Sequence, residues 1–160
     1  MANQQFELLT TAGYIEYFSD LADQTTFIDT FYYTYNEFTS KAKTNRTGTV
    51  MVLEPYTNSI SENQNDNTLA RREGFFAILQ QANSPADFPQ VQGECELLCY
   101  ALMGQIKRDS REFKLRAPIS NWRGSEVTPI SSVKYVGYAI EFTFEAPINR
   151  FMAKNPEHWK

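Results

Sequence analysis

The sequence contains a single histidine, His158, close to its C-terminal end. Most zinc sites, and the Ser-His-Asp and Cys-His sites of hydrolases, need histidine, and a residue near a chain end is usually too mobile to hold catalytic geometry. The motifs GxxxxGK[ST], GxGxxG, CxxC and HExxH are missing as well. We therefore expect a protein that is not an enzyme, with no catalytic residue, no cofactor and no metal.

Cysteine and long apolar runs are also scarce. Cys95 and Cys99 are four residues apart, which stacks them on one face of a helix and predicts two reduced, packed thiols. The first residues lack the basic and apolar regions of a signal peptide, and no run of about 18 apolar residues occurs. These absences predict a cytoplasmic protein with no membrane partner.

The charge balance excludes another class of partner. The formal net charge is −4, which does not attract a phosphate backbone, so we expect no nucleic-acid partner. The length of 160 residues suits a single domain, and the aromatic content of 14% favours strands or contact surfaces over a simple helical bundle. We divide this domain into an N-terminal helical region (1–43), an α+β core (44–150) and a tail (151–160).

The clearest pattern lies in residues 133–146, where apolar side chains occupy every second position. This alternation predicts a long, half-buried strand with one apolar face. Glu141 and Glu145 share its polar face, and we interpret them as solvated, with an interface or catalytic pair as the alternative. The apolar face consists of Val136, Tyr138, Ile140, Phe142 and Phe144.

Three segments have helical spacing. Residues 93–110 predict a helix whose apolar residues Leu98, Leu102 and Ile106 pack against the final strand. Residues 4–22 also predict a helix. Residues 24–42 favour a helix, although their aromatic and β-branched side chains leave a strand open.

The middle of the chain predicts a hairpin. Residues 49–53 and 75–79 are short apolar runs that we expect to pair antiparallel, joined by an exposed polar loop at 58–67. A turn is expected at 44–48, Pro85 is placed to begin a helix after Ser84, and residues 119–130 are expected to be irregular. The predicted fold is α+β, an antiparallel sheet with helices packed on one face.

Candidate contact residues fall into two groups. The polar loop could supply oxygens to calcium, but it lacks the glycine and closing glutamate of an EF-hand, so a solvated loop is favoured. Trp122, in a predicted turn at 121–124, either folds onto the sheet or anchors an interface, where Trp and Arg are enriched. The candidate interface residues are Asn63, Asn65, Asp66, Arg71, Arg72, Trp122 and Arg123.

The order of the predicted elements resembles the small tail-terminator and tail-completion proteins of bacteriophages. The resemblance covers residues 45–150 and rests on the runs 49–53 and 75–79, the helix 94–106, and the strand 138–144 followed by Ala146-Pro147-Ile148. It implies a structural protein of a phage tail, prophage or contractile injection particle. Such a protein forms a ring with copies of itself, contacts tail-tube or neck proteins, and moves from the cytoplasm into a virion or phage-like particle.

Two other functions remain open at this point. One is a small-molecule-binding or enzymatic α+β domain, with a pocket between the aromatic sheet face and the helix at 94–110. The other is a monomeric accessory domain that binds a protein partner.

Overall fold

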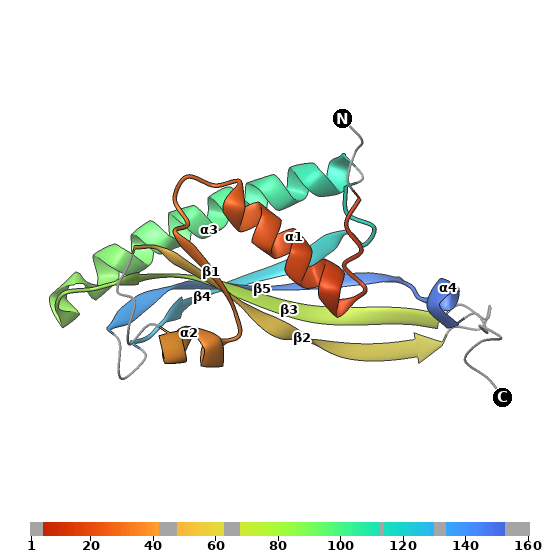
Figure 1. Cartoon of the computed structure of the whole chain (residues 1–160), viewed down its shortest axis with the longest axis horizontal. Helices are drawn as coiled ribbons and strands as arrows, with labels where there is room; N and C mark the ends of the chain where they lie inside the picture. The colour runs from red at the N-terminus through yellow and green to blue at the C-terminus, as the bar shows by residue number, and fades with distance from the viewer. Residues whose placement is uncertain (1–4, 42–47, 63–67, 113, 130–133, 153–160) are drawn as a thin grey trace.

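The protein is an α+β domain built on one five-stranded mixed sheet (Figure 1). The computed structural model describes residues 5–41, 48–62, 68–112, 114–129 and 134–152. The strand order is β1-β2-β3-β5-β4. The elements in chain order are α1 (Thr11–Asp23), β1 (Thr30–Tyr33), α2 (Tyr35–Lys41), β2 (Val50–Glu62), β3 (Thr68–Gln81), a 3-10 turn η1 (Pro85–Asp87), α3 (Phe88–Arg111), β4 (Ile119–Val127), β5 (Tyr135–Pro147) and α4 (Asn149–Met152).

The predicted hairpin and closing strand are confirmed. β2 and β3 pair antiparallel, with Val50 opposite Leu79, and β5 pairs with β3 along its whole length. β5 therefore lies inside the sheet, flanked by β3 and β4. Pro85 begins η1 after Ser84, whose amide and hydroxyl both donate to the Asp87 carboxylate.

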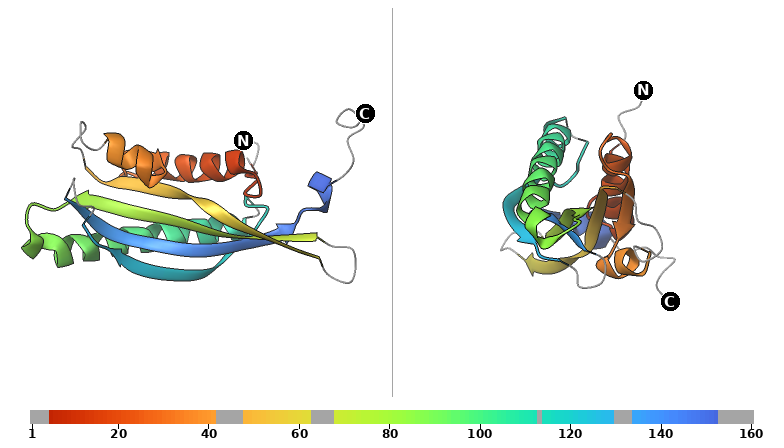
Figure 2. Two further views of the ribbon diagram at one scale, coloured as in Figure 1. Left: turned by 90° about the horizontal axis from the view of Figure 1, so that it is seen from below. Right: turned by 90° about the vertical axis from the view of Figure 1, so that its left-hand side faces the viewer.

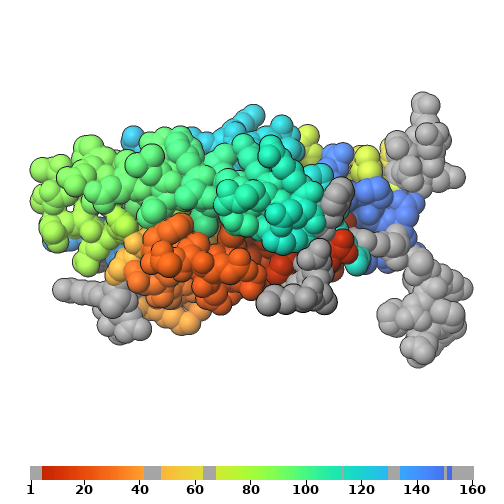
Figure 3. Space-filling view, turned by 90° about the horizontal axis from the view of Figure 1, so that it is seen from above, coloured from red at the N-terminus to blue at the C-terminus, as the bar shows by residue number. Residues whose placement is uncertain are grey.

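Helices α1 and α3 lie side by side over the upper face of the sheet (Figures 1 and 3). The predicted contact of the long helix is confirmed, because Leu102 and Ile106 belong to the same buried cluster as Phe142, and Leu98 packs at its margin. Stacked and edge-on rings fill the space beneath α1, where Phe18 stacks on Phe142 with centroids 5.4 Å apart. Dense aromatic packing of this kind stabilises the helix layer through burial and ring geometry.

A second core lies under the opposite face, which corrects the prediction that helices pack on one face only. Phe38 of α2 is fully buried there and contacts the Tyr135 ring edge-on, with centroids 5.1 Å apart. Val50 and Val52 of β2 and Ala77 of β3 join the same cluster. The inner half of the sheet, which includes residues 50–53 of β2 and 76–79 of β3, is therefore covered on both faces. This is why these strand segments are continuous apolar runs and do not alternate.

The N-terminal region is less helical than predicted. Helix α1 begins at Thr11, after Thr10 accepts the Gly13 amide at 3.1 Å, and Phe6 instead pairs with Leu115. The prediction of a helix over 24–42 is wrong for residues 30–33, because they form β1, which pairs parallel with β2. Aromatic and β-branched side chains fit a half-buried strand, and the neighbouring apolar strand outweighs the helical spacing there.

Two segments predicted as loops are strands. Residues 58–62 extend β2, because their backbone pairs with β3 even though their side chains stay exposed. Residues 119–127 form β4 along the free side of β5, not an irregular segment. The predictions for residues 44–47, 63–67 and most of the tail lie outside the described residues.

Candidate functional site

Beyond the second core, none of the helices that the structure describes covers the lower face of the sheet, and this part of the face carries an open groove. Figure 2 shows β3, β5 and β4 from below with no helix in front of them. The register shifts in both flanking strands, between Glu54 and Thr57 in β2 and between Ser120 and Arg123 in β4. Thr57 and Ser120 belong to one row across the sheet, which runs through Glu73 and Thr143. Bulges bend strands and increase their twist, so two bulges in one row make this face concave.

The groove has a volume of about 710 Å³ and draws side chains from four strands. Its charges are mixed: Arg71 lies 3.8 Å from Glu73 within β3, and Arg123 of β4 is directly opposite Glu141 of β5. The groove is lined by Pro55, Thr57, Arg71, Glu73, Gly74, Phe75, Asn121, Trp122, Arg123, Glu141, Phe142 and Thr143.

The bulge in β4 contains Asn121 and Trp122, which both border this groove. Asn121 adopts φ +53°, a left-handed conformation that Asn tolerates, and its Nδ2 donates to Thr143 Oγ1 at 2.8 Å. Trp122 is half-buried, and its ring packs on Phe142 with centroids 5.7 Å apart. Trp122 therefore lies in a strand rather than in a turn. Its ring packs against the upper core that contains Phe142, and the residue borders the groove.

The structure brings together only part of the predicted interface. Arg71, Trp122 and Arg123 line the groove, whereas Arg72 lies on the other face of β3. The Arg72 guanidinium stacks 4.3 Å above the Tyr56 ring, and its Nε donates to Asn58 Oδ1 at 3.3 Å. Asn63, Asn65 and Asp66 lie outside the described residues.

Some groove residues escaped the sequence reasoning. Glu73, Asn121 and Thr57 were not singled out, because only the pairing of four strands and the two bulges places them beside Trp122. Glu141 and Glu145 were predicted to share the polar strand face, and both are exposed, opposite Arg123 and Arg71 respectively. The sequence of a single strand does not predict that Arg123 lies opposite Glu141 or Arg71 opposite Glu145, because each pair joins two different strands.

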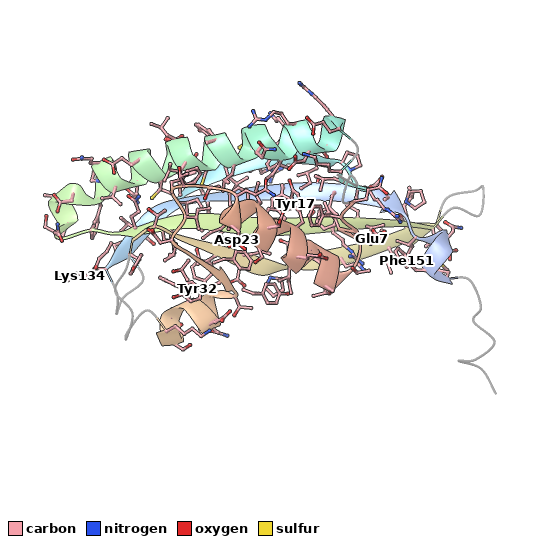
Figure 4. The ribbon with its side chains drawn as sticks, turned by 45° about the horizontal axis from the view of Figure 1, so that its top comes forward. Glu7, Tyr17, Asp23, Tyr32, Lys134 and Phe151 are labelled. Atoms are coloured by element: carbon pink, nitrogen blue, oxygen red, sulfur yellow. The ribbon has the colours of Figure 1, made fainter. Side chains whose placement is uncertain are left out.

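The outer half of β2 forms a second exposed feature. β1 pairs only with residues 50–53 of β2, so among the described strands the rest of that edge has no neighbour. Residues 57–62 are exposed on both faces of the strand, and Ile60 is 60% exposed. Phe151 of α4 lies near this end of the molecule (Figure 4). Unpaired strand edges present rows of backbone donors and acceptors to other chains.

The two cysteine thiols are poorly placed for chemistry. Cys95 and Cys99 are both free and fully buried, as predicted, and burial raises the pKa of each thiol to about 12. The thiolate is the reactive form, so both stay inert near neutral pH. No group of three or more potential metal ligands occurs among the described residues.

A buried polar cluster ties α1 to the end of α3. Asp109 is 6% exposed and accepts from the Tyr17 hydroxyl at 3.0 Å, from Gln105 at 2.9 Å and from Lys114 at 3.1 Å. Tyr17 points from α1 toward α3 (Figure 4), and burial, together with the Asp109 charge, raises the pKa of its hydroxyl. Because every partner of the carboxylate is a donor, we interpret this cluster as a structural clamp rather than a site.

No protein-family model matches the sequence, and no curated protein matches it. No helix that the structure describes is long and apolar enough to cross a membrane.

Proposed function

We propose that this chain is a structural assembly subunit of a phage tail or phage-tail-like particle, and that it works through surface contacts with copies of itself and with tail-tube or neck proteins. One observation carries the proposal: Arg71 and Arg123 lie on the lower sheet face and line one open groove, and Trp122, whose ring packs on Phe142 of the upper core, borders the same groove. Trp and Arg are enriched at the centres of protein interfaces, and Trp122 is already held in place by its contact with Phe142.

The element order adds support of a weaker kind. The runs that resemble tail-terminator proteins lie in β2, β3, α3 and β5, which follow one another in the expected order. Fold-level analogy does not determine function, so the surface is the stronger argument. A contact between two different patches closes into a ring when its rotation permits, and the tail tube can serve as the template.

The test compares the groove with a distant surface. Light scattering is recorded at rising protein concentration, with and without the tube protein encoded nearest to this chain. We expect binding or oligomer formation, and we expect the double variant R71E/R123E to weaken it. Lys134→Glu is the matched control, because Lys134 is exposed just before β5 begins, at an end of the sheet and outside the groove (Figure 4). A mass fixed at 18.5 kDa in every mixture would contradict the proposal.

A second candidate function is small-molecule binding. The volume of the groove, about 710 Å³, falls in the range of ligand pockets. Much of the space between the sheet and α3 holds buried core side chains such as Leu102 and Phe142, but a hollow of about 500 Å³ lies beside α3, lined by residues that include Gln80 and Leu98. This function could use the lower groove or that hollow, and it gains weight if no mixture shows association.

A further inference from the structure

We propose that the outer edge of β2 pairs with the same edge of a second copy of this chain, across a two-fold axis at Ser59. The pair would join two sheets into one through antiparallel backbone hydrogen bonds. This inference concerns a different surface from the lower groove and does not depend on the proposed function.

The first argument is that edge protection in the outer part of β2 is confined to its start, where Pro55 and the bulge between Glu54 and Thr57 lie. Natural edge strands carry lysine, proline, inward-pointing charge or a covering element that blocks pairing. Residues 56–62 of β2, Tyr-Thr-Asn-Ser-Ile-Ser-Glu, contain no lysine and no proline. Their single charge is Glu62, at the end of the strand. Among the strands that the structure describes, none pairs with this edge over these seven residues.

The second argument is the distribution of side chains on the two faces of this edge. Thr57 lines the lower groove, so by alternation Ser59 and Ser61 share its face. Tyr56 lies on the other face, because its ring contacts Tyr14 of α1 with centroids 5.1 Å apart. Asn58 lies there too, since it accepts from Arg72, whose guanidinium covers Tyr56. Ile60 and Glu62 follow Asn58 on the upper face.

The third argument is that these faces complement themselves. In an antiparallel pair centred on Ser59, all seven residues find a partner, and Ser59 meets Ser59 of the second copy. On the lower face, Thr57 meets Ser61 of the second copy, a small hydroxyl pair of the kind that stabilises cross-strand contacts. On the upper face, Ile60 lies opposite Asn58 of the second copy, and the two Ile60 side chains become diagonal neighbours.

The ends of the pair are complementary in charge. Glu62 of one copy lies opposite Tyr56 of the other, whose ring carries the Arg72 guanidinium at 4.3 Å. The two-fold axis repeats this contact, so two Glu62–Arg72 pairs flank the central Ile60 side chains. Ile60, at 60% exposed, is among the large apolar side chains that the monomer leaves in water. Pairing would bury the Ile60 side chain in the centre of the interface, between the two Glu62–Arg72 pairs, where no charged side chain lies.

The first experiment traps the pair. In Ser59→Cys, oxidation should give a disulfide-linked dimer of the full chain, because directly opposed strand residues bring their Cβ atoms to about 4.5–5.5 Å. Cys95 and Cys99 do not interfere, since both are fully buried. Ser125→Cys is the matched control: Ser125 is exposed on the other edge strand, β4, and should stay monomeric.

The second experiment tests the charges in solution. Sedimentation equilibrium of the unmodified chain should give a mass that rises from 18.5 kDa toward twice that value as the concentration increases to ~1 mM. Glu62→Arg should weaken the dimer ~10-fold or more by facing Arg72, and the double variant E62R/R72E should recover most of that loss. Circular dichroism confirms that each variant is folded.

The outcomes separate this inference from the proposed function. A monomer at every concentration, with no disulfide dimer of Ser59→Cys, overturns the edge pairing even if a tube protein binds the lower groove. The pairing is also overturned if oligomers form with the same affinity in Glu62→Arg and if Ser59→Cys gives no disulfide-linked dimer, because another surface then holds the copies together. Dimers that form through Ser59 while R71E/R123E changes nothing support the edge and contradict the groove.

Discussion

Single residues in the centre of the sheet leave little tolerance for change. Gly137 of β5 lies between β3 and β4, where a Cβ atom would fall inside the contact distance of the Ile78 carbonyl oxygen. Gly93 of α3 is different, since a Cβ atom there meets nothing within 4 Å. The same substitution should therefore have opposite effects at these two glycines.

We expect Gly137→Ala to lower the free energy of unfolding by about 1–3 kcal/mol, because the backbone of β3 must move. We expect Gly93→Ala to raise it by about 0.5–1 kcal/mol, because alanine favours an unobstructed helix interior. Urea unfolding followed by circular dichroism measures both. If both variants shift stability in the same direction, the close approach of β3 and β5 is contradicted.

The buried thiols predict a dependence of stability on alkaline pH. Burial raises the pKa of Cys95 and Cys99 to about 12, from an ordinary value of 9.0. The unfolded chain therefore releases these protons first, so the contribution of the two thiols to the free energy of unfolding is constant below about pH 9 and falls as pH rises toward 12. Each thiol contributes up to about 1.4 kcal/mol per pH unit over that range.

Urea midpoints at pH 7, 9 and 10 test this slope, and the double variant C95A/C99A should show a shallower one. Tyr14 and Tyr17 contribute in the same direction, because burial also raises the pKa of their hydroxyls. At pH 7, native protein should not react with a thiol reagent until urea is added. Rapid labelling of the folded protein would show that the thiols are accessible.

At the scale of elements, the long helix α3 offers a direct comparison of its two faces. Leu102 is 1% exposed in the core, whereas Leu97, on the same helix, is 68% exposed. Leu102→Ala should lower the free energy of unfolding by about 2–5 kcal/mol through lost burial and a residual cavity. Leu97→Ala should change it by less than about 0.5 kcal/mol. A cost below about 0.5 kcal/mol for Leu102→Ala in urea unfolding would show that this face is not buried.

At the scale of the whole molecule, the sheet has two halves of different character. The inner half lies between the upper helices and the second core, while the outer part of β2 has, among the described strands, only β3 as a neighbour. Local opening is easiest where few apolar contacts hold the backbone. Native-state hydrogen exchange should therefore be slowest at residues 50–53 and much faster at 57–62 in dilute protein.

The same measurement reports on association. Residues 57–62 should gain protection as the protein concentration rises, while residues 50–53 should not change. Protection of 57–62 that is already complete in dilute protein would contradict the open edge. Gains confined to the groove residues of β4 would place the contact on the lower face instead.

Local patterns were sufficient for the elements with one strong apolar face. Alternation over residues 133–146 predicted β5, and the spacing of Cys95, Leu102 and Ile106 predicted α3, because burial of such a face dominates the choice of conformation. The antiparallel pairing of β2 with β3 followed from two short apolar runs.

Tertiary pairing decided the rest. Residues 58–62 and 119–127 carry too little apolar surface to predict a strand, and they become strands because backbone donors and acceptors of β3 and β5 are available beside them. β1 is a strand for the same reason, since the helical spacing of its aromatic residues yields to pairing with β2. The groove and the open edge of β2 arise from bulges and strand order. These depend on which segments become neighbours, and no local pattern in the chain records that.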